Sequence, residues 1–227
     1  MKKLKLALLG SSGGYAYDYL ISAINLGLLS AEVSIIITDR ECRTEAIANK
    51  HNIRHVRIKQ DLNLSRDEYS NRLYNEIPPS TDLVLINLRR LISGKLLDEY
   101  HNRIMNTHPS LLPAYRGFGA ISNLISEGKT VFGGCSCHLV NSEADDGPMV
   151  IQTVLPLDFE QTEESWALKL WLHQRHNQVQ AVQFFAENRV RLQGTRVKIE
   201  GANYRSLPTN PAIEIDFSML DNQFKVV

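Results

Sequence analysis

The feature that most constrains the fold is a repeated alternation between short buried strands and helical segments. Residues 33–38 form an uncharged β-branched run, which is typical of a strand covered on both faces. Residues 82–86 form another buried strand, and segments with helical apolar spacing lie between such runs. Strands that alternate with helices indicate a parallel sheet with right-handed crossover connections. We therefore expect an α/β fold with a mostly parallel sheet and helices on both faces.

Individual elements can be placed along the chain. Residues 3–9 alternate charged and apolar side chains and predict the first strand, which a Gly-Ser loop and a helix follow. Ser65 with Glu68 three residues later is the pattern of a capping box, and it predicts a helix that ends near Ile77. We expect further helices at 43–50, 120–127 and 161–186, and further strands at 53–58, 103–106, 131–140 and 149–155.

The C-terminal segment carries weaker signals than the rest of the chain. Short strand patterns at 197–199 and 213–217 are separated by Pro208 and Pro211. We interpret residues 194–227 as an irregular β tail that is not an independent domain. The preceding residues, 1–193, are expected to form one Rossmann-like catalytic domain.

Charge and hydropathy exclude two classes of partner. Twenty-five Lys and Arg balance twenty-five Asp and Glu, so no broad positive field is available to hold nucleic acid or an anionic membrane. The longest apolar runs have the length of strands and fall far short of the roughly 20 residues that cross a bilayer. The apolar stretch after the N-terminal lysines is too short for a signal peptide. We expect neither a nucleic-acid nor a membrane partner.

The cysteines suggest a reducing environment. Three cysteines cannot all pair, and Cys135 and Cys137 are too close for a relaxed disulfide. Two thiols on one strand face could begin a zinc site, but no second pair of ligands completes it. We therefore expect reduced buried thiols, no metal and a cytoplasmic location.

The loop at residues 10–14 is the first place with chemical character. Ligands of parallel sheets collect outside the carboxyl ends of the strands, where this Gly-Ser-Ser-Gly-Gly loop is expected. Its glycines would let backbone N–H groups converge on an anion at a helix N-terminus. The spacing differs from G-x-G-x-x-G, so a dinucleotide site is not supported. A plain tight turn explains the loop equally well.

Asn106, His108 and an acidic loop at 143–147 form a second group. In an extended chain, Asn106 and His108 project from the same face. An amide can hydrogen-bond an oxygen on which negative charge develops, and an imidazole can take a proton from an attacking amine. A nearby carboxylate could orient or protonate the histidine. The plainer alternatives are a structural histidine in a proline loop and a solvated acidic hairpin.

Two motifs together favour the catalytic interpretation. The sequence N-T-H-P-S-L-L-P spans residues 106–113, and D-D-G-P-M-V-I-Q spans residues 145–152. In this order they resemble the folate-dependent formyltransferases, and among these most closely the glycinamide ribonucleotide (phosphoribosylglycinamide) formyltransferases. The family motif N-x-H-P-S-L-L-P is followed further along the chain by an aspartate, a glycine two positions on and a strand. The close resemblance covers residues 82–157.

The resemblance implies roles for particular residues. Asn106 would polarise the formyl oxygen of 10-formyltetrahydrofolate, and His108 with Asp145 would handle the proton. An amine would attack the formyl carbon, and the tetrahedral intermediate would collapse with loss of tetrahydrofolate. His138 also falls on a family position near the site, although a core histidine is equally consistent. The implied folate-binding residues, whose apolar and backbone groups suit a flat ring, are Leu88, Arg89, Arg90, Leu91, Ile92, Val140, Asn141 and Glu143.

The acceptor half departs from the family pattern. The asparagines of the family's G-N-G-S-N loop are absent from residues 10–14, and Arg175-His176 replaces a Glu-His pair in the last long helix. An arginine would repel an ammonium group and would suit an acceptor that carries an anion. Arg66 matches a family arginine near the acceptor. The acceptor-binding residues expected on this basis are Gly10, Ser11, Ser12, Gly13, Arg66 and Arg175.

We therefore expect formyl transfer from 10-formyltetrahydrofolate to the primary amine of a small anionic acceptor. Several alternatives stay open: glycinamide ribonucleotide formylation itself, N-formylation of an amino-sugar nucleotide, hydrolysis of formyltetrahydrofolate, and a non-catalytic folate-binding protein. Against hydrolysis, that family usually has a second histidine where Pro109 stands. Formylation of tRNA would need a basic C-terminal domain, whereas this tail is short and carries Glu200, Glu214, Asp216 and Asp221. The sequence leaves the acceptor and the oligomeric state open, a homo-oligomer included.

Overall fold

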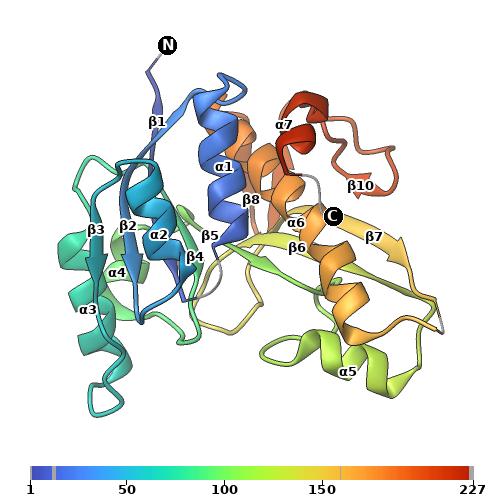
Figure 1. Ribbon diagram of the computed structural model, residues 1–227, viewed down its shortest axis with the longest axis horizontal. Helices are drawn as coiled ribbons and strands as arrows, with labels where there is room; N and C mark the ends of the chain where they lie inside the picture. Colours follow the sequence, from blue (N-terminus) through green and yellow to red (C-terminus); the bar gives the residue numbers. More distant parts are fainter. Residues whose placement is uncertain (1, 12–13, 159, 225–227) are drawn as a thin grey trace. The chain divides into compact units, whose positions relative to one another are not determined.

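The computed structural model describes residues 2–11, 14–158 and 160–224, and these fall into two compact units. The first unit consists of Met1–Asn106 with Val140–Ser142, and the second of Thr107–Leu139 with Glu143–Val227. Figure 1 labels the helices and strands of both units. No helix in the described ranges is long and apolar enough to cross a membrane.

A parallel sheet forms the centre of the first unit. Its strands follow the order β5-β4-β1-β2-β3, and each neighbouring pair is parallel. The side chains of Leu6, Ala7, Leu8 and Leu9 in the central strand are all fully buried, as expected for a strand covered on both faces. The strands are β1 (Leu4–Gly10), β2 (Ala31–Thr38), β3 (His55–Arg57), β4 (Leu83–Asn87) and β5 (Ile104–His108).

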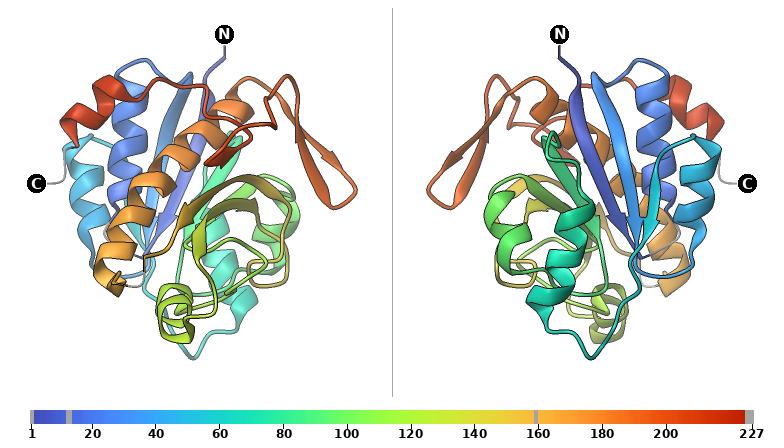
Figure 2. Two further views of the ribbon diagram at one scale, coloured as in Figure 1. Left: turned by 90° about the vertical axis from the view of Figure 1, so that its right-hand side faces the viewer. Right: turned by 90° about the vertical axis from the view of Figure 1, so that its left-hand side faces the viewer.

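Four helices cover this sheet. Figure 2 shows α1 (Tyr15–Asn25) and α2 (Arg43–Lys50) on one face, with α3 (Arg66–Glu76) and α4 (Gly94–Glu99) on the other. The predicted capping box at the start of α3 is present, because the Ser65 hydroxyl accepts the Glu68 N–H and the Glu68 carboxylate accepts the Ser65 N–H. Helix α4 was not predicted, because six residues are too few for a helical period to show.

The second unit is built on an antiparallel hairpin. Strands β6 (Phe132–Leu139) and β7 (Met149–Pro156) pair across the acidic loop, and the short strand β10 (Thr209–Asn210) pairs with β7. Helices α5 (Ala120–Glu127) and α6 (Glu163–Ala186) complete the unit. Trp166 and Leu170 of α6 pack against Leu124 of α5 and against the hairpin residues Cys135 and Leu155. This apolar cluster joins the two helices to the hairpin.

The C-terminal segment differs from the expected β tail in one place. Strands β8 (Val190–Gln193) and β9 (Arg196–Ile199) form an antiparallel hairpin, which agrees with the strand predicted at 197–199. The strand predicted at 213–217 is wrong, and a short helix, α7 (Ser218–Gln223), follows that segment. The backbone N–H groups of Glu214 and Ile215 donate to the side-chain oxygen of Gln180 in α6 instead of to a neighbouring strand. The expected α/β, Rossmann-like class with mostly parallel pairing is nevertheless confirmed.

Candidate active site

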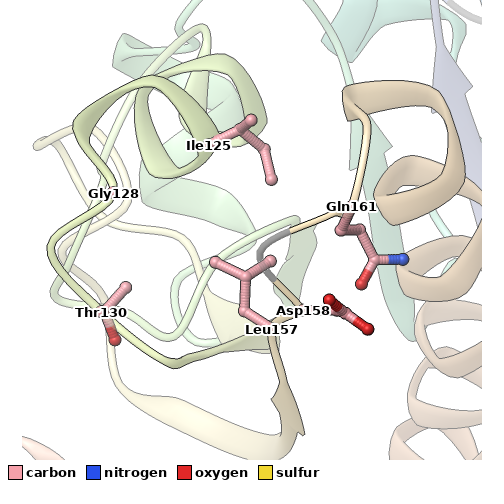
Figure 3. A pocket seen from close by; sticks show the side chains of 6 residues that line it. All are labelled: Ile125, Gly128, Thr130, Leu157, Asp158 and Gln161. Atoms are coloured by element: carbon pink, nitrogen blue, oxygen red, sulfur yellow. The ribbon is translucent and has the colours of Figure 1, made fainter.

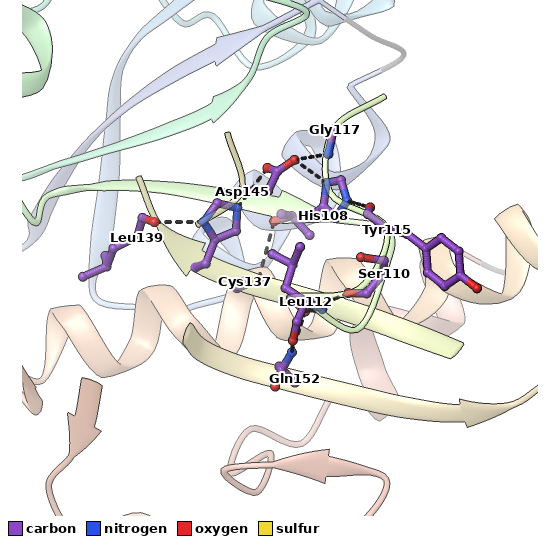
Figure 4. A network of polar contacts seen from close by, with 12 residues as sticks. His108, Ser110, Leu112, Tyr115, Gly117, Cys137, Leu139, Asp145 and Gln152 are labelled. Carbon is purple, nitrogen blue, oxygen red and sulfur yellow. Dashed lines mark hydrogen bonds and ion pairs between the residues drawn. The ribbon is translucent and has the colours of Figure 1, made fainter. Parts of the chain in front are cut away.

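A carboxylate between two histidines is the central polar feature of the second unit. In Figure 4, Asp145 lies beside His108 at the end of β5, with its Oδ2 atom 3.3 Å from the histidine Nδ1. The other carboxylate oxygen, Oδ1, lies 3.4 Å from Nε2 of His138 on β6. The backbone N–H of Gly117 donates to Oδ2 at 2.8 Å. His108 and His138 are only 6% and 2% exposed, so the three groups meet in a nearly dry environment.

These contacts determine the protonation of Asp145. Burial raises the pKa of its carboxyl group, but the hydrogen bond from His138, the charge of His108 and the Gly117 N–H together lower it to about 2. Asp145 is therefore ionised at neutral pH. Its backbone has a φ of 50°, a value that residues other than glycine rarely adopt and that is common at functional sites.

Each histidine also contacts a backbone carbonyl group. His108 Nε2 lies 2.8 Å from the Tyr115 oxygen, and His138 Nδ1 lies 2.8 Å from the Leu139 oxygen. A carbonyl and a carboxylate can only accept hydrogen bonds, so these contacts orient each ring. The His108 ring is thus held from two sides, by the Tyr115 carbonyl and by the Asp145 carboxylate.

The proline-rich loop that follows His108 is held by side chains of the hairpin (Figure 4). Ser136 of β6 donates its hydroxyl to the Ser110 carbonyl at 2.7 Å and accepts the Leu112 N–H at 3.2 Å. The side-chain amide of Gln152 in β7 donates to the Leu112 carbonyl at 3.0 Å. The two prolines predict an ordered loop, and these hydrogen bonds supply the order.

The first unit brings together the segments expected to hold a folate ring. Leu88 and Val140 both pack against an apolar cluster beneath α3 and α4, and Ile92 belongs to that cluster. The Val140 N–H donates to the Ile104 carbonyl of β5 at 2.9 Å, which fixes the second segment to the sheet. Leu91, between the buried residues, is 42% exposed. The two segments thus contact the same apolar cluster of the first unit.

Asn106 lies at the carboxyl edge of the parallel sheet. It pairs with Ile86 of β4, and the neighbouring strand ends pair Gly10 with Asn87. Strand β5 continues through His108, so the chain itself places Asn106 and His108 on one strand face, two residues apart. This is the arrangement that the sequence predicts.

A separate small hollow, open to solvent, lies in the second unit between the end of α5 and the start of α6 (Figure 3). Apolar Ile125 and Leu157 face polar Asp158 and Gln161 across it. None of the residues predicted to act in catalysis or binding lines it. The cluster around Asp145 is therefore the better candidate for an active site.

A model of the protein family described as formyl transferase matches residues 4–182. The chain belongs to the formyl transferase family. The match includes the Asp145 cluster and the loop at 88–92, and it ends before β8. The sequence-based resemblance to formyltransferases is thus confirmed, and the family uses 10-formyltetrahydrofolate as its formyl donor.

Several known proteins are similar to this formyl transferase. Phosphoribosylglycinamide formyltransferase of Mycobacterium tuberculosis is 28% identical over 192 residues, which cover 84% of this chain and 88% of the relative. The trifunctional purine biosynthetic protein adenosine-3 of Bos taurus is 28% identical over 194 residues, and the chain spans only 19% of its length. Formyltetrahydrofolate deformylase of Haemophilus influenzae is 28% identical over 165 residues, which cover 66% of this chain and 58% of the relative.

A solved structure has the same fold. The crystal structure of glycinamide ribonucleotide transformylase 1 from Symbiobacterium toebii matches with a TM-score of 0.80 and 26% identity. The match covers 87% of this chain and 94% of that chain. The fold of this formyl transferase and that of the neighbour therefore agree over nearly the whole neighbour.

The residues predicted to bind the acceptor are distributed over both units. Gly10 and Ser11 lie at the end of β1, where the Ser11 N–H donates to the Asn87 carbonyl at 2.9 Å. Ser12 and Gly13 lie outside the described residues. Arg66 is the exposed first residue of α3. Arg175, the last of the predicted acceptor-binding residues, lies in α6 of the second unit.

Arg175 is already bound within this formyl transferase. One guanidinium nitrogen lies 2.8 Å from Oδ1 of Asp221 in α7, and His176 Nε2 lies 3.0 Å from the same oxygen. The His176 ring stacks on Phe217 with 4.5 Å between ring centres. Arg175 is only 4% exposed, so an acceptor anion would have to displace Asp221 to reach it. We therefore no longer assign Arg175 to the acceptor.

Some partners of the candidate site are not apparent from the sequence. The period of two residues along β6 places Ser136, which holds the proline loop, on the same strand face as His138, which contacts Asp145. The family resemblance places His138 near the site, whereas for Ser136 this period was the available signal. Tyr115 and Gly117 contribute only backbone groups, which no pattern of side-chain types can reveal.

Proposed function

We propose that this protein transfers a formyl group from 10-formyltetrahydrofolate to the primary amine of a small acceptor that carries an anion. The observation that carries the proposal is the ionised carboxylate of Asp145 between two buried histidines, one of them two residues after Asn106. Formyl transfer needs a hydrogen-bond donor for the developing oxyanion and a group that moves a proton. Asn106 and His108 supply these groups.

The chemistry follows from these roles. When the amine attacks the formyl carbon, the carbonyl electron pair moves to oxygen, and the Asn106 side-chain amide donates a hydrogen bond to that oxygen. His108 relays the proton that the amine loses to the folate nitrogen that departs. Asp145 balances the charge of the His108 ring whenever the ring carries two protons. The C–N bond to folate breaks, and tetrahydrofolate leaves with the relayed proton.

The donor is proposed to lie against the apolar surface of the first unit. Leu88, Leu91, Ile92 and Val140 offer apolar contacts to a flat ring, and the surrounding backbone offers hydrogen bonds. Three further residues remain proposed at the edge of this site: Arg89, Asn141 and Glu143. We assign the activity to residues 1–193, with residues 194–227 as an accessory tail.

Glycinamide ribonucleotide, also called phosphoribosylglycinamide, is the first acceptor to test. Two of the similar proteins carry one of these two terms in their names. An amino-sugar nucleotide is the second, because the loop at 10–14 lacks asparagine side chains. Gly10, Ser11, Ser12, Gly13 and Arg66 remain the proposed acceptor-binding residues. The site of action is proposed to be the cytoplasm, with the three cysteines as free thiols.

Water is the alternative acceptor. The similarity to a formyltetrahydrofolate deformylase over 66% of the chain supports hydrolysis as a second candidate function. The same candidate residues would serve, because water replaces the amine as the attacking group. The two functions differ only in what attacks the formyl carbon.

One assay separates these proposals. Purified protein is incubated with 10-formyltetrahydrofolate, and tetrahydrofolate is measured with glycinamide ribonucleotide, with an amino-sugar nucleotide and with buffer alone. Product that depends on an amine supports transfer, and equal product in buffer alone supports hydrolysis. No product in any reaction, together with no calorimetric binding of 5-formyltetrahydrofolate at millimolar concentration, would contradict the proposed function.

A further inference from the structure

The side chain of Arg90 points from the loop at 88–92 to a second loop of the same unit. One guanidinium nitrogen donates to the Asp61 carbonyl at 2.9 Å, and another donates to the Leu64 carbonyl. The guanidinium also lies over the Tyr69 ring, 5.1 Å from its centre. The planar face of the Arg90 guanidinium and two of its nitrogens are thus engaged in contacts within the protein.

Other contacts fix the backbone on both sides of Arg90. The N–H of Arg89 donates to the Ser11 hydroxyl at 3.3 Å, and the N–H of Ser93 donates to the Ser70 hydroxyl at 3.0 Å. These two bonds hold the ends of the loop. The Arg90 side chain ties the middle of the loop, next to the exposed Leu91.

Arg103 provides an internal comparison, because it makes the same set of contacts. Its guanidinium donates to the Thr81 carbonyl at 3.3 Å and to the Glu99 carbonyl at 2.6 Å, and it lies 4.8 Å from the centre of the Tyr100 ring. Arg103 precedes β5, whereas Arg90 follows β4. The two arginines therefore lie at opposite ends of neighbouring parallel strands, and ligands of such sheets bind at the carboxyl ends.

We propose that Arg90 is a positioning residue for the formyl donor, an inference that rests on the proposed function. Its guanidinium holds the loop at 88–92 against residues 61–64, so that Leu88, Ile92 and the loop backbone are ordered before the folate binds. A loop that is ordered in advance costs less conformational entropy on binding. Arg90 acts through this loop and does not itself contact the carboxylates of the ligand.

Two ligands distinguish this role from direct contact. Calorimetry measures the dissociation constants of 5-formyltetrahydrofolate and of 5-formyltetrahydropteroate, which lacks the glutamate carboxylates, for wild type and Arg90→Ala. Positioning predicts that Arg90→Ala weakens both ligands equally, by about tenfold. Direct contact with a carboxylate would weaken only the glutamate-bearing ligand, and that result would overturn the inference. Arg90→Lys, which keeps one donor, should lose less affinity than Arg90→Ala.

Further measurements separate positioning from simple loss of stability. In Arg90→Ala, backbone amides of residues 88–92 should exchange hydrogen faster, and added ethylguanidinium should restore part of the folate affinity. At saturating donor, kcat should stay near the wild-type value while KM for the donor rises.

Arg103→Ala is the matched control for Arg90→Ala. It should lower the melting temperature by a similar amount and leave the folate dissociation constant within about twofold of wild type, because it lies away from the carboxyl edge. Equal loss of folate affinity in both variants would overturn the inference. If the wild-type protein itself binds no folate, the proposed function fails instead, and the two failures can thus be told apart.

Discussion

The two units of this protein position their candidate site residues in different ways. In the first unit, the register of parallel strands places Gly10, Asn87 and Asn106 at one edge of the sheet. In the second unit, the loop after His108 contributes a hydrogen bond to Asp145, and hydrogen bonds from the hairpin hold that loop in place. A sheet edge tolerates changes in single side chains, because backbone pairing defines it. A loop held by a few side chains should be more sensitive to their loss.

The largest effect should come from the catalytic candidates themselves, one in the first unit and two in the second. Asn106→Ala should lower kcat by about 10²–10³-fold, the usual cost of removing one oxyanion donor. His108→Ala and Asp145→Ala should lose at least as much, and the losses should not add, because the groups act together. Steady-state kinetics with the identified acceptor measure these changes. His101→Ala, at an exposed turn before β5, should leave kcat unchanged.

Near-native turnover in all three variants would contradict the proposed mechanism. A large loss in Asn106→Ala with little loss in Asp145→Ala would instead mean that the second unit contributes less to the chemistry than the first. Circular dichroism of each variant should match wild type, because these changes remove little buried apolar surface.

The next largest effect should come from the contact between β6 and the proline loop. At Gly134 an added Cβ would lie 1.9 Å from the Thr153 carbonyl oxygen and 2.7 Å from the Leu111 side chain. Gly134→Ala should therefore lower the free energy of unfolding by about 3 kcal/mol and should also lower kcat, because Leu111 must move. Urea unfolding and kinetics measure the two effects. No loss of stability would mean that the loop is not held by close packing against β6.

Gly194→Ala is the control for this prediction. Gly194 has a φ of 60° but an added Cβ would meet open space, so only backbone strain of about 1 kcal/mol is expected. Its kcat should equal that of wild type, since the turn between β8 and β9 contacts no candidate site residue in the described contacts.

A smaller effect concerns how the stability of the protein changes at acidic pH. The pKa of Asp145 is lowered to about 2, so its ionised form stabilises the folded state above the unfolded pKa of about 4. This stabilisation should disappear as the pH falls from about 4 to 2. Urea unfolding should show Asp145→Asn less stable than wild type by roughly 2 kcal/mol at pH 7, with the difference vanishing near pH 2. A difference that stays constant down to pH 2 would contradict this account.

The acid limb of the activity profile should have another origin. Asp145 remains ionised between pH 4 and 7, so a loss of kcat in that range must come from a different group. Exposed Asp158, whose carboxylate accepts the Glu160 N–H, is a suitable control, and Asp158→Asn should change neither the stability profile nor the activity profile.

The smallest effect is expected at the contact between α6 and α7. Asp221→Asn weakens the bonds to Arg175 and His176 but keeps a polar group there, so the free energy of unfolding should fall by roughly 1 kcal/mol. KM for the acceptor should not change, because Arg175 is bound within the protein. An acceptor KM that changes severalfold would return Arg175 to the acceptor-binding set.

Local sequence patterns determined much of the fold. Buried β-branched runs, helical spacing and the Ser65–Glu68 capping box are properties of residues close together in the chain, and each predicted an element that the structure contains. The arrangement of Asn106 and His108 was predictable for the same reason, because strand geometry alone relates residues two positions apart. The family resemblance rested on contiguous motifs of this kind.

Tertiary structure alone decided the contacts between distant residues. Asp145 meets a histidine 37 residues earlier and the backbone of Gly117, while Arg175 meets an aspartate 46 residues later. The segment at 213–217 has strand-like residues, but Gln180 takes its hydrogen bonds, so no strand forms. Periodicity encodes which face of an element is apolar, whereas the partner of a polar group depends on which elements pack together. Local patterns in the sequence therefore determined most of the elements and the relation between Asn106 and His108, and packing decided which charges are compensated within the protein.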